Sequence, residues 1–371
     1  MRDEESIIGR LLFVGFLILH PSSPILAQEF KLALPGYQFE FPRDHGSHDD
    51  YRTEWWYYTG HLQTERGRRY GFELTFFRVG VTPPETEAAT AWDLRHLSLA
   101  HFAITDIDGR RFRYYEKLNR TSPFTAGATT GYLAVFNEGW RAFTAGDGSW
   151  RVQASAGGDA IDLHLRAAKR PAIHGENGVS VKAEGVGFAS HYYSMTRLVA
   201  SGTVAVAGRK AEGVTGLVWM DHEFGSAALR ENQVGWDWFS IQLDNEAELM
   251  LYVIRRADGT PDVTSSGSFI TDSGEVIHIR RNDMQITPIS TWRSPRSGAT
   301  YPMGWTIRVP SLRIALTVKS LLEDQELVTK ASTQVTYWEG AVDVSGSSGN
   351  IAVRGSGYVE MTGYDRAFRQ P

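Results

Sequence analysis

Two acids and a histidine occupy consecutive positions in the segment "GLVWMDHEFG", which spans residues 216–225. If this segment is a β-strand, its side chains alternate between two faces. One face would then carry Trp219, Asp221 and Glu223, and the other Met220, His222 and Phe224. We therefore do not expect Asp221 and His222 to act together, although they are neighbours in the chain.

Asp221 has the residue type and surroundings of a proton donor. If the face with Trp219 lines the interior of a barrel, Asp221 enters a cavity with aromatic walls, where burial raises the pKa of a carboxyl group and favours its neutral form. A neutral acid there can protonate a carbon–carbon double bond, ring faces stabilise the resulting cation, and water completes a hydration. The alternative is a half-buried Asp221 that accepts hydrogen bonds from backbone donors at the end of a strand.

The segment "HGSHDDYRTEWW" combines residue types that bind metal ions. Its candidate ligands are His45, His48, Asp49 and Asp50. Glycine, serine and aspartate also form turns, so a turn that begins the first strand explains the same residues. We favour the turn and assign no metal site.

Alternation over "TEWWYYTGHL" places Glu54, Trp56 and Tyr58 on one face of a strand. If the chain returns through a hairpin at "ERGRR", Glu54 lies near Arg78 across the strand pair. An ion pair that closes one end of a barrel is a sufficient structural explanation for these two residues. Trp56 and Tyr58 are candidates for a binding cavity, with packing in the core as the alternative.

The composition argues against several classes of protein. The 371 residues carry a formal net charge of −5, which gives no reason to expect nucleic acid as a partner. The chain lacks cysteine, so disulfides, thiolate catalysis and cysteine-ligated metals are excluded. It also lacks G-x-S-x-G, H-E-x-x-H, Walker A and dinucleotide-binding motifs, which argues against a serine hydrolase, a zincin and a nucleotide enzyme.

The N-terminal region has the pattern of an export signal. Arg10 precedes the apolar run "LLFVGFLILHPSSPILA", and Ala27 fits the position before a cleavage site. We therefore expect a signal peptide at 1–27 and a mature protein in the periplasm or outside the cell. The alternative is an uncleaved anchor that keeps the protein at the membrane, although the apolar run is short for a span.

Most of the chain is predicted to form β-strands. Short runs rich in Val, Tyr, Phe, Trp and Thr, such as "RYGFELTFF", "GWDWFSIQL" and "ELMLYVIRR", are separated by turns such as "DIDGR" and "TDSGE". Few segments have the periodicity of a long amphipathic helix. The fold class is therefore all-β, either a sandwich or a barrel.

Similar segments recur in the same order, which indicates two copies of one β unit. "WWYYTGHLQ…YGFELTFFR" resembles "WDWFSIQLDN…ELMLYVIRR", "EGWRAF" resembles "MGWTIRV", and "VTGLVWMDHEFG" resembles "VRGSGYVEMTGY". We expect the copies at residues 28–230 and 231–371, each an antiparallel barrel of roughly eight or more strands. The last pair of segments places Asp221 at the same strand position as Glu360.

Six segments together resemble a known family: "FPRDHGSHDDYRTEWWYYTGHL", "YGFELTFFR", "SHYYSMTRL", "WMDHEFG", "YWEGAV" and "GYVEMTGY". The chain is similar to the AttH-like proteins, which share a lipocalin-like fold with carotenoid 1,2-hydratases (hydroxyneurosporene synthases). The resemblance covers nearly all of the mature chain and implies two tandem lipocalin-like antiparallel β-barrel domains. Carotenoid hydratases add water to an isoprenoid double bond, whereas AttH-like members are often associated with ABC transporter components.

The resemblance also implies roles for particular residues. Asp221 in "WMDHEFG" matches the acidic position that is expected to donate the proton in the hydratases. Aromatic residues would line the ligand cavity, with the tryptophans stabilising a cation: Trp219, Trp236, Trp238, Tyr192 and Tyr193. We add Trp56, Tyr58 and His222 to this candidate ligand-binding set.

Two functions remain open at this point. One is an enzyme that adds water to a C=C bond of a hydrophobic, isoprenoid or lipid-like ligand by acid catalysis from Asp221, without an organic cofactor. The other is a non-catalytic carrier of such a ligand that works with an envelope ABC transporter. The apparent export signal differs from the photosynthetic hydratases and argues against a carotenoid, though not against a hydrophobic ligand.

Overall fold

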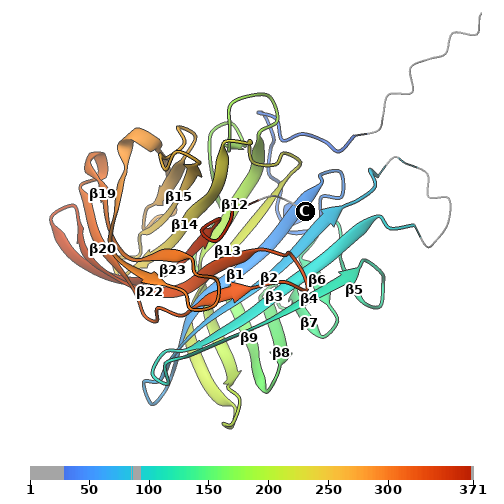
Figure 1. The fold of residues 1–371 in the computed structure, drawn as a ribbon. Helices are drawn as coiled ribbons and strands as arrows, with labels where there is room; N and C mark the ends of the chain where they lie inside the picture. Colours follow the sequence, from blue (N-terminus) through green and yellow to red (C-terminus); the bar gives the residue numbers. More distant parts are fainter. Residues whose placement is uncertain (1–28, 85, 87–92, 369–371) are drawn as a thin grey trace, which may run out of the picture.

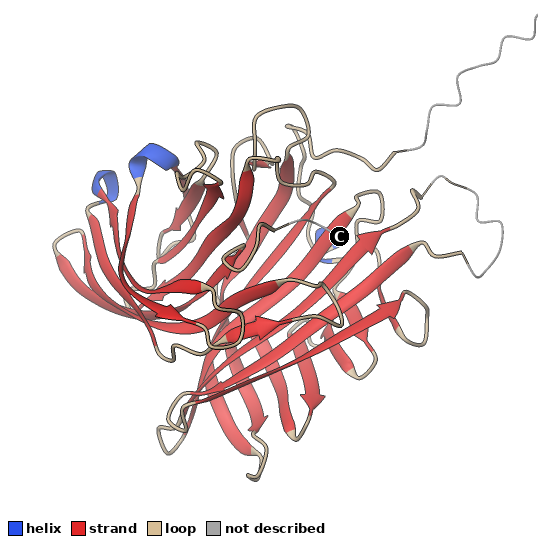
Figure 2. Ribbon diagram, in the orientation of Figure 1, coloured by secondary structure: helices blue, strands red, loops and turns tan. Residues whose placement is uncertain are grey.

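The computed structural model describes residues 29–84, 86 and 93–368, so the predicted signal peptide at 1–27 lies outside the described residues. Within them the regular structure is almost entirely β-strand (Figure 2). The short 3-10 turns of this part are η1 (Arg43–His45), η2 (Arg281–Asp283) and η3 (Pro310–Leu312). None of the helices found there has the length and apolar character needed to span a membrane.

The first sheet is an antiparallel barrel that nearly closes (Figure 1). Its strand order is β4-β3-β2-β1-β13-β12-β9-β8-β7-β6-β5, with β10 and β11 paired to β12. The strands are β1 (Thr53–Thr64), β2 (Arg69–Gly80), β3 (His96–Asp106), β4 (Arg111–Arg120), β5 (Ala126–Ala128), β6 (Ala134–Asn137), β7 (Trp140–Thr144), β8 (Trp150–Ala156), β9 (Asp159–Ala167), β10 (Ala172–Ile173), β11 (Ser180–Val181), β12 (Ala189–Ala205) and β13 (Glu212–Gly225). The two ends of the sheet approach each other, because Lys117 Nζ of β4 donates to the main-chain oxygen of Asn137 in β6.

The second sheet forms a half-barrel beside the first (Figure 1). Its strand order is β17-β16-β15-β14-β23-β22-β20-β19-β18, with β21 paired to β22. The strands are β14 (Gln233–Leu243), β15 (Glu248–Arg256), β16 (Ser266–Ile270), β17 (Val276–Arg280), β18 (Gln285–Arg293), β19 (Thr300–Val309), β20 (Ile314–Ser320), β21 (Glu326–Val328), β22 (Thr336–Ser348) and β23 (Ile351–Thr362). The first sheet ends at Gly225 and the second begins at Gln233.

The predicted fold class, all-β with two lipocalin-like barrel domains, is confirmed, with one difference in how far each sheet closes. Among the described residues the path of the second sheet has nine strands, against eleven in the first. This smaller sheet curves without pairing β17 to β18, so its barrel stays open on one side. It is the shorter of the two copies that the sequence indicates.

Strand positions confirm the internal repeat at the centre of each sheet. β1, β2, β12 and β13 occupy the same places in the first sheet as β14, β15, β22 and β23 in the second. One predicted match was wrong, because "EGWRAF" contributes to β7 whereas "MGWTIRV" belongs to β19, whose counterpart by strand order is β8. The two segments share a tryptophan and an alternating pattern, and an offset of one strand leaves both features unchanged.

Each sheet buries an apolar core on one face, and the opposite faces of the central strands pack against each other. Alternation along β1 separates these environments. Trp56 and Tyr58 belong to the core of the first barrel. Tyr57 between them joins the interface cluster and meets Trp238 of β14 edge to face, with ring centres 5.1 Å apart. The interface between the sheets is therefore a third apolar cluster, built from both copies.

Candidate active site

A mostly apolar cavity of about 220 Å³ lies between the two sheets. We call it the central cavity. The central strands β1, β2, β12 and β13 contribute to one wall, and β14, β15, β22 and β23 to the other. The sequence analysis considered a cavity inside one barrel, whereas this cavity lies between the two sheets. Alternation defines the two faces of a strand without saying which face is concave.

Asp221 of β13 lines the central cavity and is buried, with 4% of its surface exposed. Tyr192 Oη donates to Oδ2 over 2.5 Å, Trp219 Nε1 donates to Oδ1 over 2.5 Å, and Ser194 also donates to Oδ1. Trp238 Nε1 of β14 in turn donates to Tyr192 Oη over 3.0 Å. The acid is therefore held by side chains, partly through the second barrel, and not by the backbone donors of the alternative.

A neutral histidine lies behind Ser194. His174 Nε2 lies 2.6 Å from Ser194 Oγ, and His174 Nδ1 lies 2.9 Å from Ser268 Oγ of β16. Burial lowers the pKa of His174 to about 3, so the ring carries no charge. It fixes the serine that donates to Asp221 and adds another contact between the two barrels.

The environment of Asp221 makes it an acid that titrates near neutral pH. Burial raises the pKa of Asp221 from 3.8 to about 7, although its three hydrogen bonds lower it. The nearby carboxylate of Glu223 adds to the upward shift. A buried carboxyl group with such a pKa can hold a proton at neutral pH and release it to a substrate.

Two further carboxyl groups line the central cavity, those of the buried Glu73 of β2 and the partly buried Glu360 of β23. Burial raises the pKa of Glu360 to about 8 and that of Glu73 to about 7. Thr75 Oγ1 donates to Glu73 Oε1 over 2.7 Å, while Glu73 Oε2 has no hydrogen-bond partner among the described residues. Carboxyl groups gathered in one mostly apolar cavity disfavour each other's ionisation, so they share protons.

An ion pair lies in the wall of the same cavity. Lys182 Nζ lies 3.0 Å from Glu223 Oε1, and 4.2 Å and 5.1 Å from the ring centres of Tyr252 and Tyr192. Burial acts against the charge of Lys182, yet the carboxylate of Glu223 raises its pKa, so the ammonium group stays charged. The pair gives a mostly apolar cavity one fixed polar feature that could orient a ligand.

The predicted ligand-binding residues fall on two different faces. Tyr192, Trp236 and Trp238 line the central cavity. Trp219 packs in the interface cluster and donates to Asp221 without lining the cavity. The remaining four lie on the opposite face, in or against the core of the first barrel: Trp56, Tyr58, Tyr193 and His222. The geometry places these four residues away from the central cavity, because the opposite face of each strand meets the second sheet.

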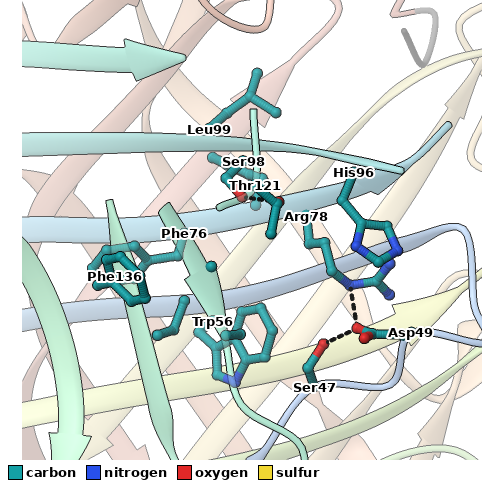
Figure 3. Close-up of a pocket in the computed structure, with 14 residues that line it drawn as sticks. Ser47, Asp49, Trp56, Phe76, Arg78, His96, Ser98, Leu99, Thr121 and Phe136 are labelled. Carbon is teal, nitrogen blue, oxygen red and sulfur yellow. Dashed lines mark hydrogen bonds and ion pairs between the residues drawn. The ribbon is translucent and has the colours of Figure 1, made fainter. Parts of the chain in front are cut away.

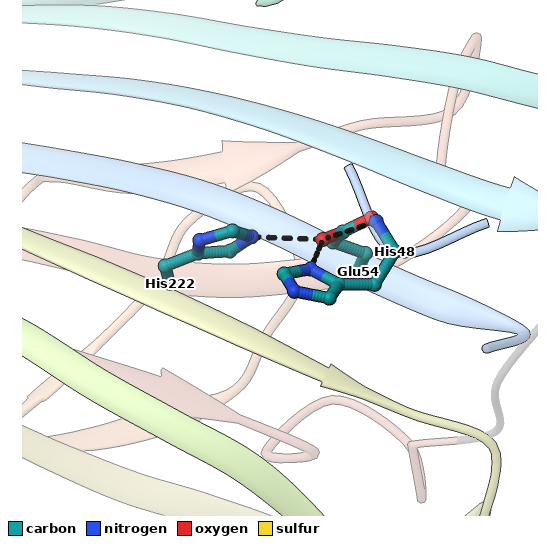
Figure 4. Close-up of side chains that lie close together, drawn as sticks. All are labelled: His48, Glu54 and His222. Carbon is teal, nitrogen blue, oxygen red and sulfur yellow. Dashed lines mark hydrogen bonds and ion pairs between the residues drawn. The ribbon is translucent and has the colours of Figure 1, made fainter. Parts of the chain in front are cut away.

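A second polar cluster lies around Glu54, at one end of the first barrel (Figure 4). Glu54 Oε1 lies 2.8 Å from both His48 Nδ1 and His222 Nε2, and Glu54 Oε2 lies 3.0 Å from Arg78 Nε. Glu54 and Arg78 are direct partners across β1 and β2, which confirms the predicted hairpin pairing. Burial acts against the charge of Glu54, but Arg78 and the histidines hold its pKa well below the usual value.

Two histidines and a carboxylate also have the ligand types of a metal site, and their ligand atoms lie within 4.8 Å of one another. The outer nitrogens are already engaged, however. His48 Nε2 lies 3.2 Å from Asp44 Oδ1, and His222 Nδ1 lies 3.1 Å from Tyr193 Oη. Because Arg78 already neutralises the carboxylate, these contacts form a hydrogen-bonded ion-pair network, and we propose no metal there.

The other candidate metal ligands of the sequence lie apart from one another. His45 Nδ1 lies 2.7 Å from Tyr193 Oη, Asp49 Oδ1 lies 3.6 Å from Arg78 Nε, and Asp50 pairs with Lys31. A small cavity of about 40 Å³ lies beside Arg78 (Figure 3). It has room for water but not for a hydrophobic ligand of the expected size.

Some residues of the central cavity were missed by the sequence reasoning. Tyr57 had a usable signal, because the internal repeat aligns it with Trp238, which was predicted. Glu73 had a weaker one, since an acid within the apolar run "YGFELTFF" is unusual for a buried strand. Lys182 follows the short strand β11, and no local pattern marks it.

Comparisons with known proteins agree with this fold. The AttH-like family profile matches residues 32–364. A crystal structure described as an AttH protein of Nitrosomonas europaea has a TM-score of 0.81 at 32% identity, covering 90% of this chain and 99% of that chain. Kievitone hydratase of Fusarium solani subsp. phaseoli is 25% identical over 250 residues, 64% of this chain and 67% of that protein. Dehydratase asqC of Emericella nidulans is 21% identical over 290 residues, 70% of this chain and 75% of that protein.

Proposed function

The chain belongs to the AttH-like family, and from that premise we propose that it is a hydro-lyase that adds water to a C=C bond of a hydrophobic substrate in the central cavity. The observation that carries this proposal is Asp221, a buried carboxyl group among aromatic rings with a pKa of about 7. A hydratase and a dehydratase among the relatives support the same class of reaction.

In the first step Asp221 gives its proton to one carbon of the double bond, whose π electrons form the new C–H bond. The cation left on the other carbon faces the rings of Tyr192, Trp238 and Tyr57, which attract positive charge. The hydrogen bonds from Tyr192, Trp219 and Ser194 stabilise the carboxylate that remains. The same donors that hold the acid therefore favour release of its proton.

In the second step water adds to the cation, the C–O bond forms, and a carboxylate of the cavity takes the surplus proton. Glu73 and Glu360 are the available acceptors, since both are acids in the cavity wall. The mostly apolar lining suits an isoprenoid or lipid-like substrate. Every group this chemistry needs belongs to the chain or to water.

The second candidate is a carrier that binds such a molecule without chemical change and works with an envelope ABC transporter. The mostly apolar lining of the central cavity favours it, because binding alone explains that feature. A carrier has no use for a buried acid with a pKa near neutrality, which is why we rank it second.

The test is turnover of two probes, kievitone and neurosporene, in water labelled with heavy oxygen, read by mass spectrometry. We expect the label in the product with wild type, and roughly a hundredfold or greater loss of turnover in Asp221→Asn with probe binding retained, as measured by tryptophan fluorescence. The exposed Glu65→Gln serves as the control. Full turnover in Asp221→Asn contradicts the mechanism, and binding without turnover in wild type favours the carrier.

A further inference from the structure

A chain of four hydrogen bonds runs from the central cavity towards the surface of the first barrel. Tyr337 Oη of β22 lies 3.3 Å from Glu73 Oε1 and 2.6 Å from His101 Nδ1. On the far side of the ring, His101 Nε2 lies 2.9 Å from Ser332 Oγ, and Ser332 donates to Glu116 Oε2 over 2.6 Å. Each of these side chains can accept and release a proton in its ordinary chemistry.

The two ends of this chain differ in their access to solvent. Glu73, Tyr337 and His101 are buried and line the central cavity, and Ser332 is buried behind them. Glu116 of β4 is partly exposed. The chain therefore joins a buried acid of the cavity to a carboxylate that can exchange protons with water. It combines residues from both barrels, so it exists only when the two sheets are docked.

We propose that Tyr337, His101 and Ser332 form a proton relay between Glu73 in the central cavity and Glu116 at the surface of the first barrel. This inference rests on the proposed hydratase function, because there Asp221 loses a proton to the substrate and a different carboxylate gains one from water. If acid and base are different groups, protons must be redistributed before the next turnover. The relay supplies that step.

In the relay each group donates a hydrogen bond to the next, in the direction from Glu73 to Glu116. Burial lowers the pKa of His101 to about 3, so its ring is neutral and carries a single proton. Because the Ser332 hydroxyl donates to Glu116, its oxygen is free to accept from His101 Nε2–H, which leaves Nδ1 to accept from Tyr337. Tyr337 Oη donates to Glu73 Oε1 when Glu73 is ionised, and protonation of Glu73 reverses this hydrogen bond, so that Glu73 donates to Tyr337 Oη and completes the series.

The charges around Tyr337 favour a neutral hydroxyl in the relay. Burial raises the pKa of Tyr337 well above its usual value, and the carboxyl groups of Glu73, Glu339 and Glu360 raise it further. Tyr337 therefore passes a proton on while it receives another, without forming a phenolate. The ring of Phe77 packs edge-on against His101, with centres 5.2 Å apart, and adds no charge.

One passage along the relay moves one proton from Glu73 to solvent, and each group between them gives up one proton and receives another. Glu73 takes the proton released by the added water and passes it to Tyr337, which gives its own to His101 Nδ1. His101 Nε2 releases its proton to Ser332, Ser332 gives one to Glu116, and Glu116 loses it to solvent. Tyr337 now donates to Glu73 and the His101 proton sits on Nδ1, so the next passage runs inward. The inward passage returns a proton to Glu73, and exchange through water among the carboxyl groups of the central cavity moves that proton to Asp221. One outward and one inward passage therefore balance the proton that hydration releases and the proton that it uses.

The first experiment compares the initial turnover with steady-state turnover of kievitone. Glu116→Gln keeps an oxygen that accepts from Ser332 but cannot take up a proton. We expect its first turnover, at excess enzyme, to match wild type and its steady-state rate to fall roughly a hundredfold. Ser332→Ala should behave alike, while Ser332→Thr, which restores the hydroxyl, should recover the rate. A wild-type steady-state rate in Glu116→Gln overturns the relay.

A measurement without substrate separates the relay from the proposed function. After rapid mixing with heavy water, the infrared band of protonated Glu73, identified by its loss in Glu73→Gln, reports proton exchange with solvent. We expect Glu116→Gln and His101→Gln to slow this exchange by at least roughly tenfold, and the exposed Glu65→Gln to leave it unchanged. If no probe turns over, the proposed function fails, yet slow exchange still supports the relay. Unchanged exchange in both relay variants overturns it.

Discussion

Asp221 and Glu360 occupy equivalent positions in the two sheets and line the same cavity. Asp221 pairs with Tyr57 across β13 and β1, and Glu360 pairs with Trp238 across β23 and β14. Burial raises both pKa values, to about 7 and about 8. The internal repeat thus brings two acids at equivalent strand positions into one mostly apolar cavity, where ionisation of one disfavours ionisation of the other.

The pH dependence of the free energy of unfolding should show the raised pKa of Glu360. Burial raises its pKa from 4.5 to about 8, so the folded state keeps a proton that the unfolded state releases. The stabilisation is complete below pH 4.5 and is lost as the pH rises to about 8, at about 1.4 kcal/mol for each pKa unit. We expect Glu360→Gln to lose less stability than wild type over this range in urea unfolding. Parallel curves for the two proteins would show that Glu360 does not titrate in the folded state.

The pH dependence of turnover should show that the protonated form of Asp221 is the proton donor. The proposed step needs the protonated acid, and burial sets the pKa of Asp221 at about 7. Above that pH the acid form declines, so kcat/KM should fall about tenfold for each further pH unit. The measurement is turnover of the probe across a buffer series in which the protein stays folded by circular dichroism. A rate that stays level or rises above pH 7 argues against Asp221 as the proton donor.

The substitution Tyr192→Phe should shift the fall of kcat/KM to higher pH. The Tyr192 hydroxyl donates to Asp221 and lowers its pKa, so its removal raises the pKa and carries the decline in turnover to higher pH. Tyr193→Phe is the matched control, because Tyr193 is the next residue in β12 but lies in the core of the first barrel. An equal displacement in both variants would point to a general loosening of the fold and not to the contact with Asp221.

Strand alternation and the internal repeat made much of the arrangement around Asp221 predictable from the sequence. Alternation placed Trp219 on the same face as Asp221 and Met220 on the other face. In the structure Trp219 donates a hydrogen bond to Asp221, and Met220 lies in the core of the first barrel. The raised pKa of Asp221 follows from the same pattern, since a carboxyl group among aromatic side chains loses hydration. The repeat led in addition to Glu360, which the sheet pairing confirms as the counterpart of Asp221.

The choice between the two faces of a strand could not be made from local pattern. Both faces of β1 are aromatic, with Trp56 and Tyr58 on one and Trp55 and Tyr57 on the other. Docking of the second sheet makes the Tyr57 face the cavity wall, through contacts such as the 2.6 Å hydrogen bond from Tyr57 to Glu339, 282 positions away in the chain. The relay could not be predicted from local sequence pattern either, because its residues come from both copies and from the loop before β22.

The buried pair of Glu54 and Arg78 should be a principal source of stability in the first barrel. Glu54 is fully buried and Arg78 is 4% exposed, so Arg78→Met leaves a carboxylate without its main counter-charge. We expect a loss of about 3–5 kcal/mol in the free energy of unfolding, measured with urea at neutral pH.

Arg166→Met, which removes the exposed pair with Asp147, is the control and should cost less than about 1 kcal/mol. Because Arg78 and the histidines hold the pKa of Glu54 well below 4.5, wild type loses this stabilisation as the pH falls below 4.5, and the gap to Arg78→Met should narrow there. If both variants cost the same at neutral pH, then His48 and His222 suffice to hold the buried carboxylate, and the role assigned to Arg78 is wrong.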